Sequence, residues 1–478
     1  MGDLAQNSDL SAPAKNEKGG AAATSPNALF SGEDEELLFA GVNLEVLQGA
    51  FVLSKPSVGA LSALNREEVL AFVRFYPLRE DQGQATKALI SFYETIGRDT
   101  DQAVRATSDF LARMQRDGWF REGIPEDRSK PLAAIYFTVT RRCDLACSYC
   151  YQGLANRNNT EMTVEQASDV LGKIKRVNAR AFIVVTGGEP LSHRRIFEIL
   201  ALIDDSGFQS VLLTNGTFLD EATAVFLKGL KNFFAIQLSM DGISEETHGL
   251  TRGMGHFCRV MRALECIIEQ GLPFILAPTM HSRNLHELYE IAALAVRNGG
   301  WVSPNDLREL PQPGLNFEKI HASYDRLLDA LADVGRRLEE EFGQQRIAML
   351  RDRYQPPSDC SATSPNAKFA CGMAHSIVDL DWNGDVYPCH LAKDEKLILG
   401  NAFVDDFETI LARATERRIR VRSHEIEKCS ACKFVSRCAG GCRAGAWFAY
   451  GTLLREDDLC SLYYQVHLAR LLGSVKRC

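Results

Sequence analysis

The sequence predicts an α/β protein in which helices wrap a parallel sheet that curves into a partial barrel. Between residues 131 and 345, apolar runs with strand character alternate with amphipathic helical runs in five successive pairs, and Gly or Asn follows many of the strand runs. Cysteine is distributed unevenly, because none precedes Cys143 and the chain becomes rich in cysteine after Cys371. We therefore expect a barrel flanked by a small amino-terminal domain and a cysteine-rich carboxyl-terminal domain.

The composition of the chain divides it into five parts. Residues 1–33 are rich in Ser, Ala, Asn, Gly and Pro, so they cannot offset the entropy of ordering and are predicted to be a disordered tail. Residues 34–128 contain two helical patterns, ATKALISFYETI and SDFLARMQRDGWF, which predict a small helical domain. Residues 131–345 form the predicted barrel, residues 346–370 a linker, and residues 371–470 the cysteine-rich domain.

Charge and hydrophobicity narrow the classes of partner. A formal net charge of −8 over 478 residues gives no overall electrostatic reason to bind nucleic acid or an anionic membrane. No run approaches the roughly 20 apolar residues of a membrane span, and the amino terminus has no apolar segment that would direct export. We therefore expect a cytoplasmic protein, in which the 14 cysteines stay reduced and are better explained as ligands than as disulfides.

The first cysteine motif follows the first predicted barrel strand, AAIYFTVT. Cys143, Cys147 and Cys150 have the spacing C-x3-C-x2-C, so they would lie at the carboxyl-terminal mouth of the barrel, where α/β barrels place their chemistry. Three thiolates on one loop can hold three corners of a [4Fe–4S] cluster and leave the fourth iron open. The alternative is a zinc site, but structural zinc usually takes four ligands in two pairs, and no partner pair or His lies nearby.

This loop, together with the GGEP sequence after the second strand, resembles the radical SAM superfamily, in which an aromatic residue, here Tyr149, precedes the last cysteine. The resemblance covers about residues 131–345 and implies a partial (β/α)6 barrel. It also implies that the open iron chelates S-adenosylmethionine (SAM). One electron, from a donor such as flavodoxin or ferredoxin, then cleaves SAM to methionine and a 5′-deoxyadenosyl radical that abstracts hydrogen from a C–H bond.

The resemblance implies a set of SAM contacts, which are Tyr149, Gly187, Gly188, Glu189, Asn215, Ser239 and Arg252. The glycines would let the backbone approach the ligand. The guanidinium fork of Arg252 suits the SAM carboxylate. Asn215 has an equally good explanation as part of an Asn-Gly turn at the end of a strand.

The second group of cysteines resembles the SPASM extension of radical SAM enzymes. Cys371, Gly384 and Cys389 fit C-x12-G-x4-C, then Cys429, Cys432, Cys438 and Cys442 fit C-x2-C-x5-C-x3-C, and Cys460 follows. The resemblance implies two auxiliary clusters, and hence three [4Fe–4S] clusters in all. Cys429, Cys432, Cys438 and Cys460 would hold the distal one, and Cys371, Cys389 and Cys442 the one nearer SAM.

The other cysteines and two acidic residues have less specific interpretations. Cys360 would be the fourth ligand of the near cluster, or else a free thiol in the linker, which would leave an open iron for a peptide cysteine. Cys258 and Cys266 lie in an amphipathic helical run and are expected in the core. Asp379 and Asp381 alternate beside an NGD turn and are expected on a solvated hairpin face.

The SPASM resemblance narrows the function to a few reactions. Sulfatase maturases of this family place an Asp base after the cysteine of the G-x4-C element, where this chain has His390, and residues 34–128 resemble domains with which peptide maturases grip a leader. We therefore expect a peptide or small protein substrate and an intrapeptide thioether that joins a Cys sulfur to a carbon of Asp, Glu or another residue. The alternatives are a formylglycine maturase, a carbon–carbon crosslinking maturase, and a non-enzymatic iron–sulfur or zinc scaffold. No catalytic residue is assigned.

Overall fold

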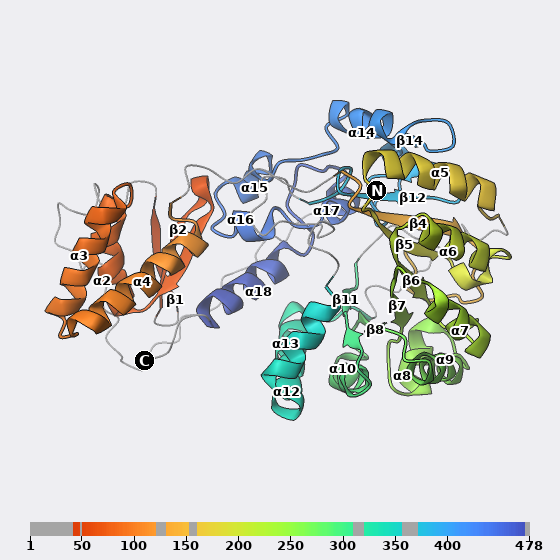
Figure 1. The fold of residues 1–478 in the computed structure, drawn as a ribbon, viewed down its shortest axis with the longest axis horizontal. Coiled ribbons are helices and arrows are strands. Elements are labelled where there is room, and N and C mark those ends of the chain that lie inside the picture. Colours follow the sequence, from red (N-terminus) through yellow and green to blue (C-terminus); the bar gives the residue numbers. More distant parts are fainter. Residues whose placement is uncertain are drawn as a thin grey trace, which may run out of the picture.

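The computed structural model describes residues 42–47, 50–120, 131–152, 160–308, 320–355 and 371–473. They form an amino-terminal unit, a barrel and a cysteine-rich region that lies between the two, as Figure 1 shows. The predicted tail at residues 1–33 and Cys360 lie outside the described residues. Within those residues, no helix is both long and apolar enough to cross a membrane.

The barrel is built from one nine-stranded sheet. In pairing order its strands are β10 (Trp301–Val302), β8 (Phe274–Ala277), β7 (Phe233–Ser239), β6 (Gln209–Thr214), β5 (Phe182–Gly187), β4 (Ala134–Thr140), β12 (Ile377–Leu380), β13 (Asp385–Tyr387) and β14 (Gly400–Asn401). The six strands from β10 to β4 are parallel, which confirms the predicted partial (β/α)6 barrel. A short parallel pair, β9 (Thr279–Met280) with β11 (Asn305–Asp306), continues beyond β8 and β10.

The sheet does not end where the predicted domain boundary does. Strand β12, from the cysteine-rich region, pairs in parallel with β4, and β13 and β14 extend the sheet with antiparallel pairing. The cysteine-rich region is therefore part of the same sheet as the barrel, although the sequence predicted a separate domain from residue 371 onward.

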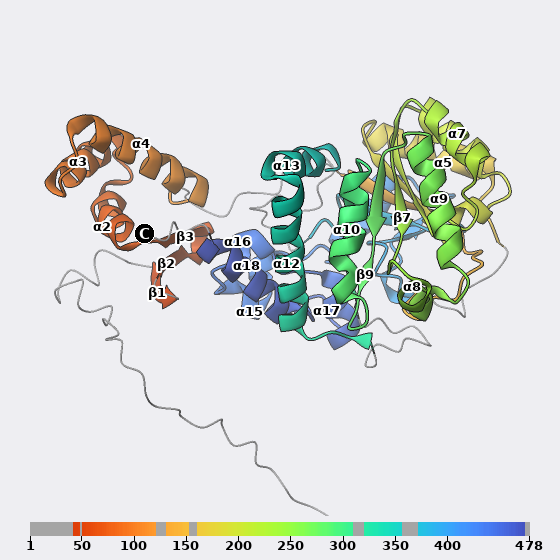
Figure 2. The same ribbon diagram turned by 90° about the horizontal axis from the view of Figure 1, so that it is seen from below.

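Helices cover the outer face of the barrel strands, as Figure 2 shows for α9 and α10. They are α5 (Val164–Val177), α6 (Ile196–Asp205), α7 (Glu221–Gly229), α8 (Glu245–Arg252), α9 (Phe257–Glu269), α10 (Leu288–Arg297), α12 (Tyr324–Phe342) and α13 (Gln344–Arg353). Local sequence sets where they begin: Thr163 and Gln166 form a capping box at α5, and the Asp220 carboxylate accepts the Thr223 N–H at α7. Their apolar faces bury residues such as Ile174 and Val260 in one continuous core.

The amino-terminal unit, residues 42–47 and 50–120, has more strand than predicted. Strands β1 (Asn43–Leu47), β2 (Ala50–Lys55) and β3 (Ala60–Leu64) form an antiparallel sheet, followed by helices α2 (Arg66–Phe75), α3 (Gln82–Thr95) and α4 (Thr100–Asp117). The sequence predicted a helical domain because the strands are short and two of them contain Ala and Ser. The unit has its own core, in which the ring centroids of Phe72 and Trp119 lie 4.6 Å apart.

The rest of the cysteine-rich region consists of short helices and loops. Its helices are α14 (Phe407–Glu416), α15 (Glu427–Ser430), α16 (Val435–Cys438), α17 (Arg443–Tyr450) and α18 (Cys460–Gly473). Helix α16 stops at Ala439, whose φ of 51° is left-handed, and Gly440 and Gly441 continue with positive φ. In Figures 1 and 2, α15, α16 and α18 lie between the amino-terminal unit and the barrel.

Candidate active site

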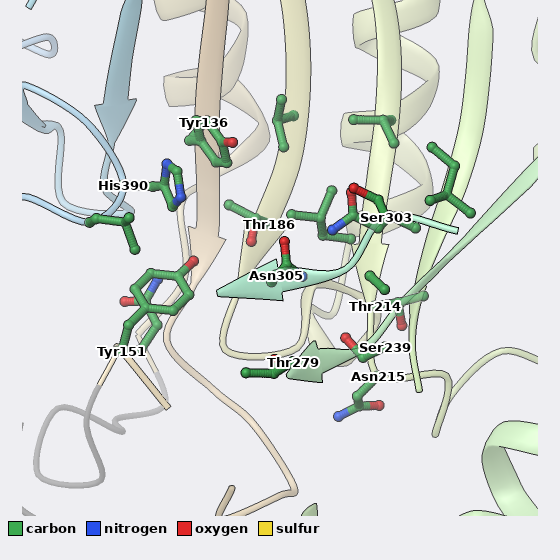
Figure 3. Close-up of a pocket in the computed structure, with 18 of the residues that line it drawn as sticks. Tyr136, Tyr151, Thr186, Thr214, Asn215, Ser239, Thr279, Ser303, Asn305 and His390 are labelled. Carbon is green, nitrogen blue, oxygen red and sulfur yellow. The ribbon is translucent and has the colours of Figure 1, made fainter. Parts of the chain in front are cut away.

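A cavity of about 1000 Å³ opens at the carboxyl ends of the parallel strands. The terminal residues Gly187, Thr214, Ser239 and Ala277 of four neighbouring strands line it. So do all of the residues predicted to contact SAM and the first three cysteines, which are Cys143, Cys147, Tyr149, Cys150, Gly187, Gly188, Glu189, Asn215, Ser239 and Arg252. Residues that the sequence separates by more than 100 positions are thus gathered around one cavity, part of which is shown in Figure 3.

The loop with the first three cysteines is held from two sides. The Ser148 N–H donates to the Thr251 carbonyl at the end of α8 (2.8 Å), and the Asn215 side-chain amide donates to Asp144 (3.0 Å). The same amide lies 4.0 Å from the Cys143 sulfur. Asn215 therefore does more than end a strand, because it fixes the loop that carries the thiols.

Gly187 and Gly188 are needed for a reason that the sequence did not reveal. A Cβ atom at either position would collide with backbone carbonyls of the cysteine loop, those of Thr140 and Arg142. The backbone N–H groups of Gly188 and Glu189 donate to these same two carbonyls, at 2.9 and 2.8 Å. The glycines thus admit the cysteine loop, while the predicted approach of their backbone to a ligand stays a prediction.

Glu189 is fully buried, and both of its carboxylate oxygens are in use. Oε1 accepts hydrogen bonds from the Thr214 hydroxyl (2.8 Å) and the Leu191 N–H (3.0 Å), and Oε2 accepts from the Asn215 N–H (2.7 Å). Burial raises the pKa of Glu189 to about 7, although these hydrogen bonds oppose the shift. Its carboxylate ties the ends of β5 and β6 together beside the cavity.

Arg252 lines the cavity and is held there by a buried carboxylate, while its contact with the SAM carboxylate stays a prediction. Its Nε and Nη2 donate to the two carboxylate oxygens of Asp241, at 2.8 and 3.2 Å. The Tyr149 hydroxyl also donates to Asp241, and the Arg252 guanidinium lies 5.6 Å from the Tyr149 ring centroid. Burial opposes the ionisation of Asp241, but Arg252 and the hydrogen bonds prevail and lower the pKa of that carboxyl.

Asp241 was missed by the sequence reasoning. The signal was its place two residues beyond the end of β7, where a buried carboxylate can reach several neighbouring strand ends. It accepts hydrogen bonds from the Thr251 hydroxyl and the Thr279 N–H, both at 2.9 Å, in addition to those from Tyr149 and Arg252. Asp241 is fully buried, and its hydrogen bonds hold Tyr149 and Arg252, two of the predicted SAM contacts, on one side of the cavity.

The expectation of a solvated hairpin face at Asp379 and Asp381 is wrong. Both residues are fully buried, because β12 pairs with β4 on one side and β13 on the other. The Lys393 ammonium lies 2.9 Å from Asp379 and 3.7 Å from Asp381, and Arg141 forms a further ion pair with Asp381. Burial raises the pKa of Asp379 to about 6, and Lys393 opposes that shift.

His390 lies on the cavity wall next to these acids. Its ring stacks on Tyr136 with centroids 3.9 Å apart, and Tyr151 meets it edge-on, as Figure 3 shows. Burial and the nearby Lys393 charge lower the pKa of His390 to about 3, so the imidazole is neutral. Among the described residues, its Nδ1 has no hydrogen-bond partner. This side of the cavity is therefore aromatic and uncharged.

The remaining described cysteines fall into two groups and two isolated thiols. Cys371, Cys389 and Cys442 lie close enough to affect one another's ionisation, and so do Cys429, Cys432, Cys438 and Cys460. These groups match the two predicted ligand sets. Cys258 is exposed on α9, so its expected core position is wrong, whereas Cys266 is partly buried against the core.

The thiol groups fit iron–sulfur clusters better than single ions. Burial raises the pKa of Cys371 to about 11 and of Cys429 to about 12, so the thiolates that ligation requires need strong positive charge nearby. Clustered irons supply such charge. In the described ranges, no three His, Cys, Asp or Glu side chains converge tightly enough for one metal ion. A cluster spreads its ligands over several irons and so needs a wider spacing.

Two family models match the chain. That of the radical SAM superfamily matches residues 137–295, and that of SPASM, an iron–sulfur cluster-binding domain, matches residues 371–433. The mycofactocin maturase MftC of Mycolicibacterium smegmatis is 25% identical over 332 residues, 68% of this chain and 82% of that protein. The AdoMet-dependent heme synthase of Nitratidesulfovibrio vulgaris is 26% identical over 359 residues, 70% of this chain and 94% of that protein.

Two solved structures share the fold. The anSMEcpe structure with bound AdoMet and Cp18Cys peptide has a TM-score of 0.55 and 21% identity, and covers 71% of this chain and 98% of that chain. Streptococcus suis SuiB bound to precursor peptide SuiA has a TM-score of 0.55 and 16% identity, and covers 88% of this chain and 98% of that chain. Residues 137–295 of this chain therefore form a radical SAM domain and residues 371–433 a SPASM domain, which supports the binding of S-adenosylmethionine and of iron–sulfur clusters.

Proposed function

We propose that this protein is a peptide or protein maturase that forms intrapeptide thioether crosslinks. The observation that carries this proposal is the placement of Cys442, a member of one auxiliary thiol group, in the same cavity as Cys143, Cys147 and Cys150. A substrate in that cavity would be exposed at once to the site of hydrogen abstraction and to an auxiliary centre. Thioether formation needs both.

Three [4Fe–4S] clusters account for the three thiol groups. We assign Cys143, Cys147 and Cys150 to the first, Cys371, Cys389 and Cys442 to the near auxiliary cluster, and Cys429, Cys432, Cys438 and Cys460 to the distal one. When bound, the first cluster and SAM would supply the 5′-deoxyadenosyl radical. The chain itself contributes the buried Asp241 network that orders Tyr149 and Arg252, and the Glu189 carboxylate that joins two strand ends.

The proposed reaction balances in hydrogen and electrons. One hydrogen atom leaves the substrate carbon for 5′-deoxyadenosyl, and the thiol of the substrate cysteine loses its proton. Formation of the C–S bond would release one electron, which a near auxiliary cluster held by Cys371, Cys389 and Cys442 could accept. The released electron would balance the one that a donor such as flavodoxin or ferredoxin supplies for SAM cleavage. Each bond therefore removes two hydrogens from the peptide.

The amino-terminal unit is the part of the chain that we assign to peptide binding. The match to SuiB covers 88% of the chain, more than the barrel and the cysteine-rich region together provide, so it extends into this unit. That structure contains a precursor peptide, whereas the anSMEcpe match covers 71% of the chain, a share that the barrel and the cysteine-rich region alone can account for. We infer that the unit binds the leader or an unstructured part of the substrate.

Two features favour thioether formation over formylglycine formation. A neutral His390 stands where sulfatase maturases place an Asp base, and the amino-terminal unit is extra to their fold. The overall build, with a similar length and a mainly helical amino-terminal region, is similar to that of the maturase that joins Cys to Asp or Glu in the γ subunit of quinohemoprotein amine dehydrogenase. A Cys-to-Asp or Cys-to-Glu thioether is accordingly the bond that we propose.

Mass spectrometry of a co-expressed substrate tests the function. The candidate substrate to test is the protein encoded beside this one, expressed with the wild-type enzyme or with the Cys143→Ala variant. We expect a loss of two hydrogens per crosslink with the wild type alone, and fragmentation that joins a Cys to an Asp or Glu. An aldehyde at a Cys or Ser, or a carbon–carbon link, would replace this proposal by one of the other two maturase reactions.

A further inference from the structure

The loop between Cys432 and Cys438 has a second role that its spacing alone does not suggest. Residues 433–437, which we call the docking loop, contact residues of the amino-terminal unit that lie more than 370 positions away in the chain. In Figures 1 and 2, β2 and β3 face α16 and α18 at this interface. The two cysteines at the ends of the loop belong to the distal thiol group.

The interface has an apolar centre. Val52, Leu61 and Ala63 of the amino-terminal sheet pack with Phe434 of the docking loop and Leu471 of α18, and all five residues are buried. Cys432 and Cys438 are themselves partly buried against this cluster. The thiols proposed to hold the distal cluster therefore contact the same side chains that bind the amino-terminal unit to the rest of the protein.

Polar groups of the docking loop complete the interface along the outer edge of β3. The buried Ser436 hydroxyl donates to the Gly59 carbonyl (2.8 Å), and an Arg437 nitrogen lies 3.5 Å from the Leu61 carbonyl. The Lys433 ammonium, which is nearly buried, forms an ion pair with Glu45 of β1. The loop thus supplies donors at the edge of the sheet, where β3 has no strand neighbour other than β2 within the described residues.

We propose that the distal cluster anchors the amino-terminal unit, so that filling this cluster places the unit that captures the peptide. The role of that unit rests on the proposed function. Helix α16 has only four residues, which is too few for a stable helix by itself. Ligation of Cys432 and Cys438 at both ends of the loop would hold Phe434 and Ser436 in the positions that dock the sheet.

Hydrogen exchange of the anaerobically reconstituted enzyme tests the anchor without any peptide. The comparison is between the wild type and a Cys429→Ala/Cys432→Ala variant that lacks the distal cluster. We expect amide exchange in residues 59–64 to become at least about tenfold faster in the variant, because an undocked edge strand opens locally. Exchange in the separate core of α2 should stay unchanged, which shows that the unit remains folded. Equal exchange in residues 59–64 would overturn the proposal.

Two glycines offer a matched pair of variants that leave every cysteine in place. Gly59 has a φ of +67°, and a Cβ there would lie 2.6 Å from the Ser436 Cβ, whereas Gly97 has a φ of +96° with nothing within 4 Å. Gly59→Ala and Gly97→Ala therefore impose similar backbone strain, but only the first pushes the docking loop away. Adding Ser436→Gly to Gly59→Ala removes the clashing atom and should restore docking.

We expect Gly59→Ala to lose about tenfold or more in affinity for the substrate peptide. The Gly59→Ala/Ser436→Gly variant should recover part of this affinity, and Gly97→Ala should bind the peptide like the wild type. Iron content and reductive SAM cleavage should not change in any of the three. Equal peptide affinity and equal exchange in Gly59→Ala and Gly97→Ala would overturn the anchor. If the wild type binds no peptide while exchange in β3 still depends on the distal cluster, the anchor stands and the peptide-binding role fails.

Discussion

At the scale of single residues, buried carboxylates determine how the site is organised. Asp241 accepts hydrogen bonds from four neighbours and Glu189 from three, whereas Asp379 and Asp381 share Lys393, and Arg141 pairs with Asp381. A buried carboxylate that loses its partner is costly, because charge in a low-dielectric interior is stable only when it is compensated. The residues that hold these carboxylates should therefore be sensitive to conservative changes.

Arg252→Lys should weaken SAM binding by about tenfold or more and lower the stability of the enzyme. A lysine keeps the charge but donates from one point, so it cannot satisfy both oxygens of Asp241 as the guanidinium does. Equilibrium dialysis with SAM and anaerobic thermal denaturation measure the two effects. Arg337→Lys, at a half-exposed ion pair with Glu290, is the control. Unchanged SAM affinity and unchanged stability in Arg252→Lys would show that the hydrogen-bond network around Asp241 does not require the two guanidinium nitrogens of Arg252.

Asp379 should make stability depend on pH near 6. Its folded pKa of about 6 lies above the unfolded value, so the folded state holds the proton more tightly, and raising the pH toward 6 costs stability until the carboxyl has ionised. We expect a loss of about 1 kcal/mol between pH 5 and pH 6, and little further change from this group above pH 7. Anaerobic urea denaturation of the wild type and of Asp379→Asn measures it. The Asp379→Asn variant should lack this fall in stability between pH 5 and pH 6. An identical fall in the variant would show that another titrating group causes it.

At the scale of elements, the three thiol groups lie on different parts of the fold. The first follows β4 at the mouth of the barrel, the near auxiliary group surrounds the β12–β13 hairpin and the start of α17, and the distal group is on α15, α16 and α18. Because each group is supported by its own local backbone, the clusters should assemble independently. The extension of the barrel sheet by β12 also explains how the near group reaches the cavity.

Replacing Cys143, Cys147 and Cys150 together by Ala should remove about a third of the iron, if the three proposed clusters are alike. All reductive cleavage of SAM should disappear with it, while the spectroscopic signals of the auxiliary clusters remain. Iron analysis and electron paramagnetic resonance of the reconstituted variant measure both. Loss of all iron would contradict independent assembly.

At the scale of the whole molecule, one cavity contains the first three cysteines and Cys442, so the proposed function places radical formation beside an auxiliary centre. Cys389→Ala should leave reductive SAM cleavage measurable but reduce crosslinking to background. The substrate radical would then lack its electron acceptor, so 5′-deoxyadenosine should form without the loss of two hydrogens from the peptide. Chromatography of 5′-deoxyadenosine and mass spectrometry of the peptide measure the two steps.

The control for this experiment is Cys258→Ala, which removes an exposed thiol on α9 far from the predicted ligand sets in sequence. It should crosslink at the normal rate. Circular dichroism separates a loss of electron transfer from a loss of fold in Cys389→Ala. If that variant folds, keeps its first cluster and still crosslinks normally, the near cluster is structural and the proposed mechanism is wrong.

The sequence predicted the features that depend on the spacing of residues close together in the chain. Cys143, Cys147 and Cys150 share one loop, and the alternation of strand and helix patterns predicts the parallel barrel, because both depend on residues that are neighbours in sequence. The residues expected to contact SAM also line one cavity, since consecutive parallel strands bring their carboxyl ends to the same edge.

Burial and partner choice could not be read in the same way, because they depend on elements that meet only after folding. The sequence predicted a solvated Asp379, but β12 pairs with β4 and buries it, and no local pattern indicated that Asp241 would hold Arg252. The glycines at the end of β5, Gly187 and Gly188, allow the packing of a loop that precedes them by more than 40 residues, and the docking loop contacts a sheet from the other end of the chain. No local pattern encodes such contacts, since each arises from the mutual packing of distant segments.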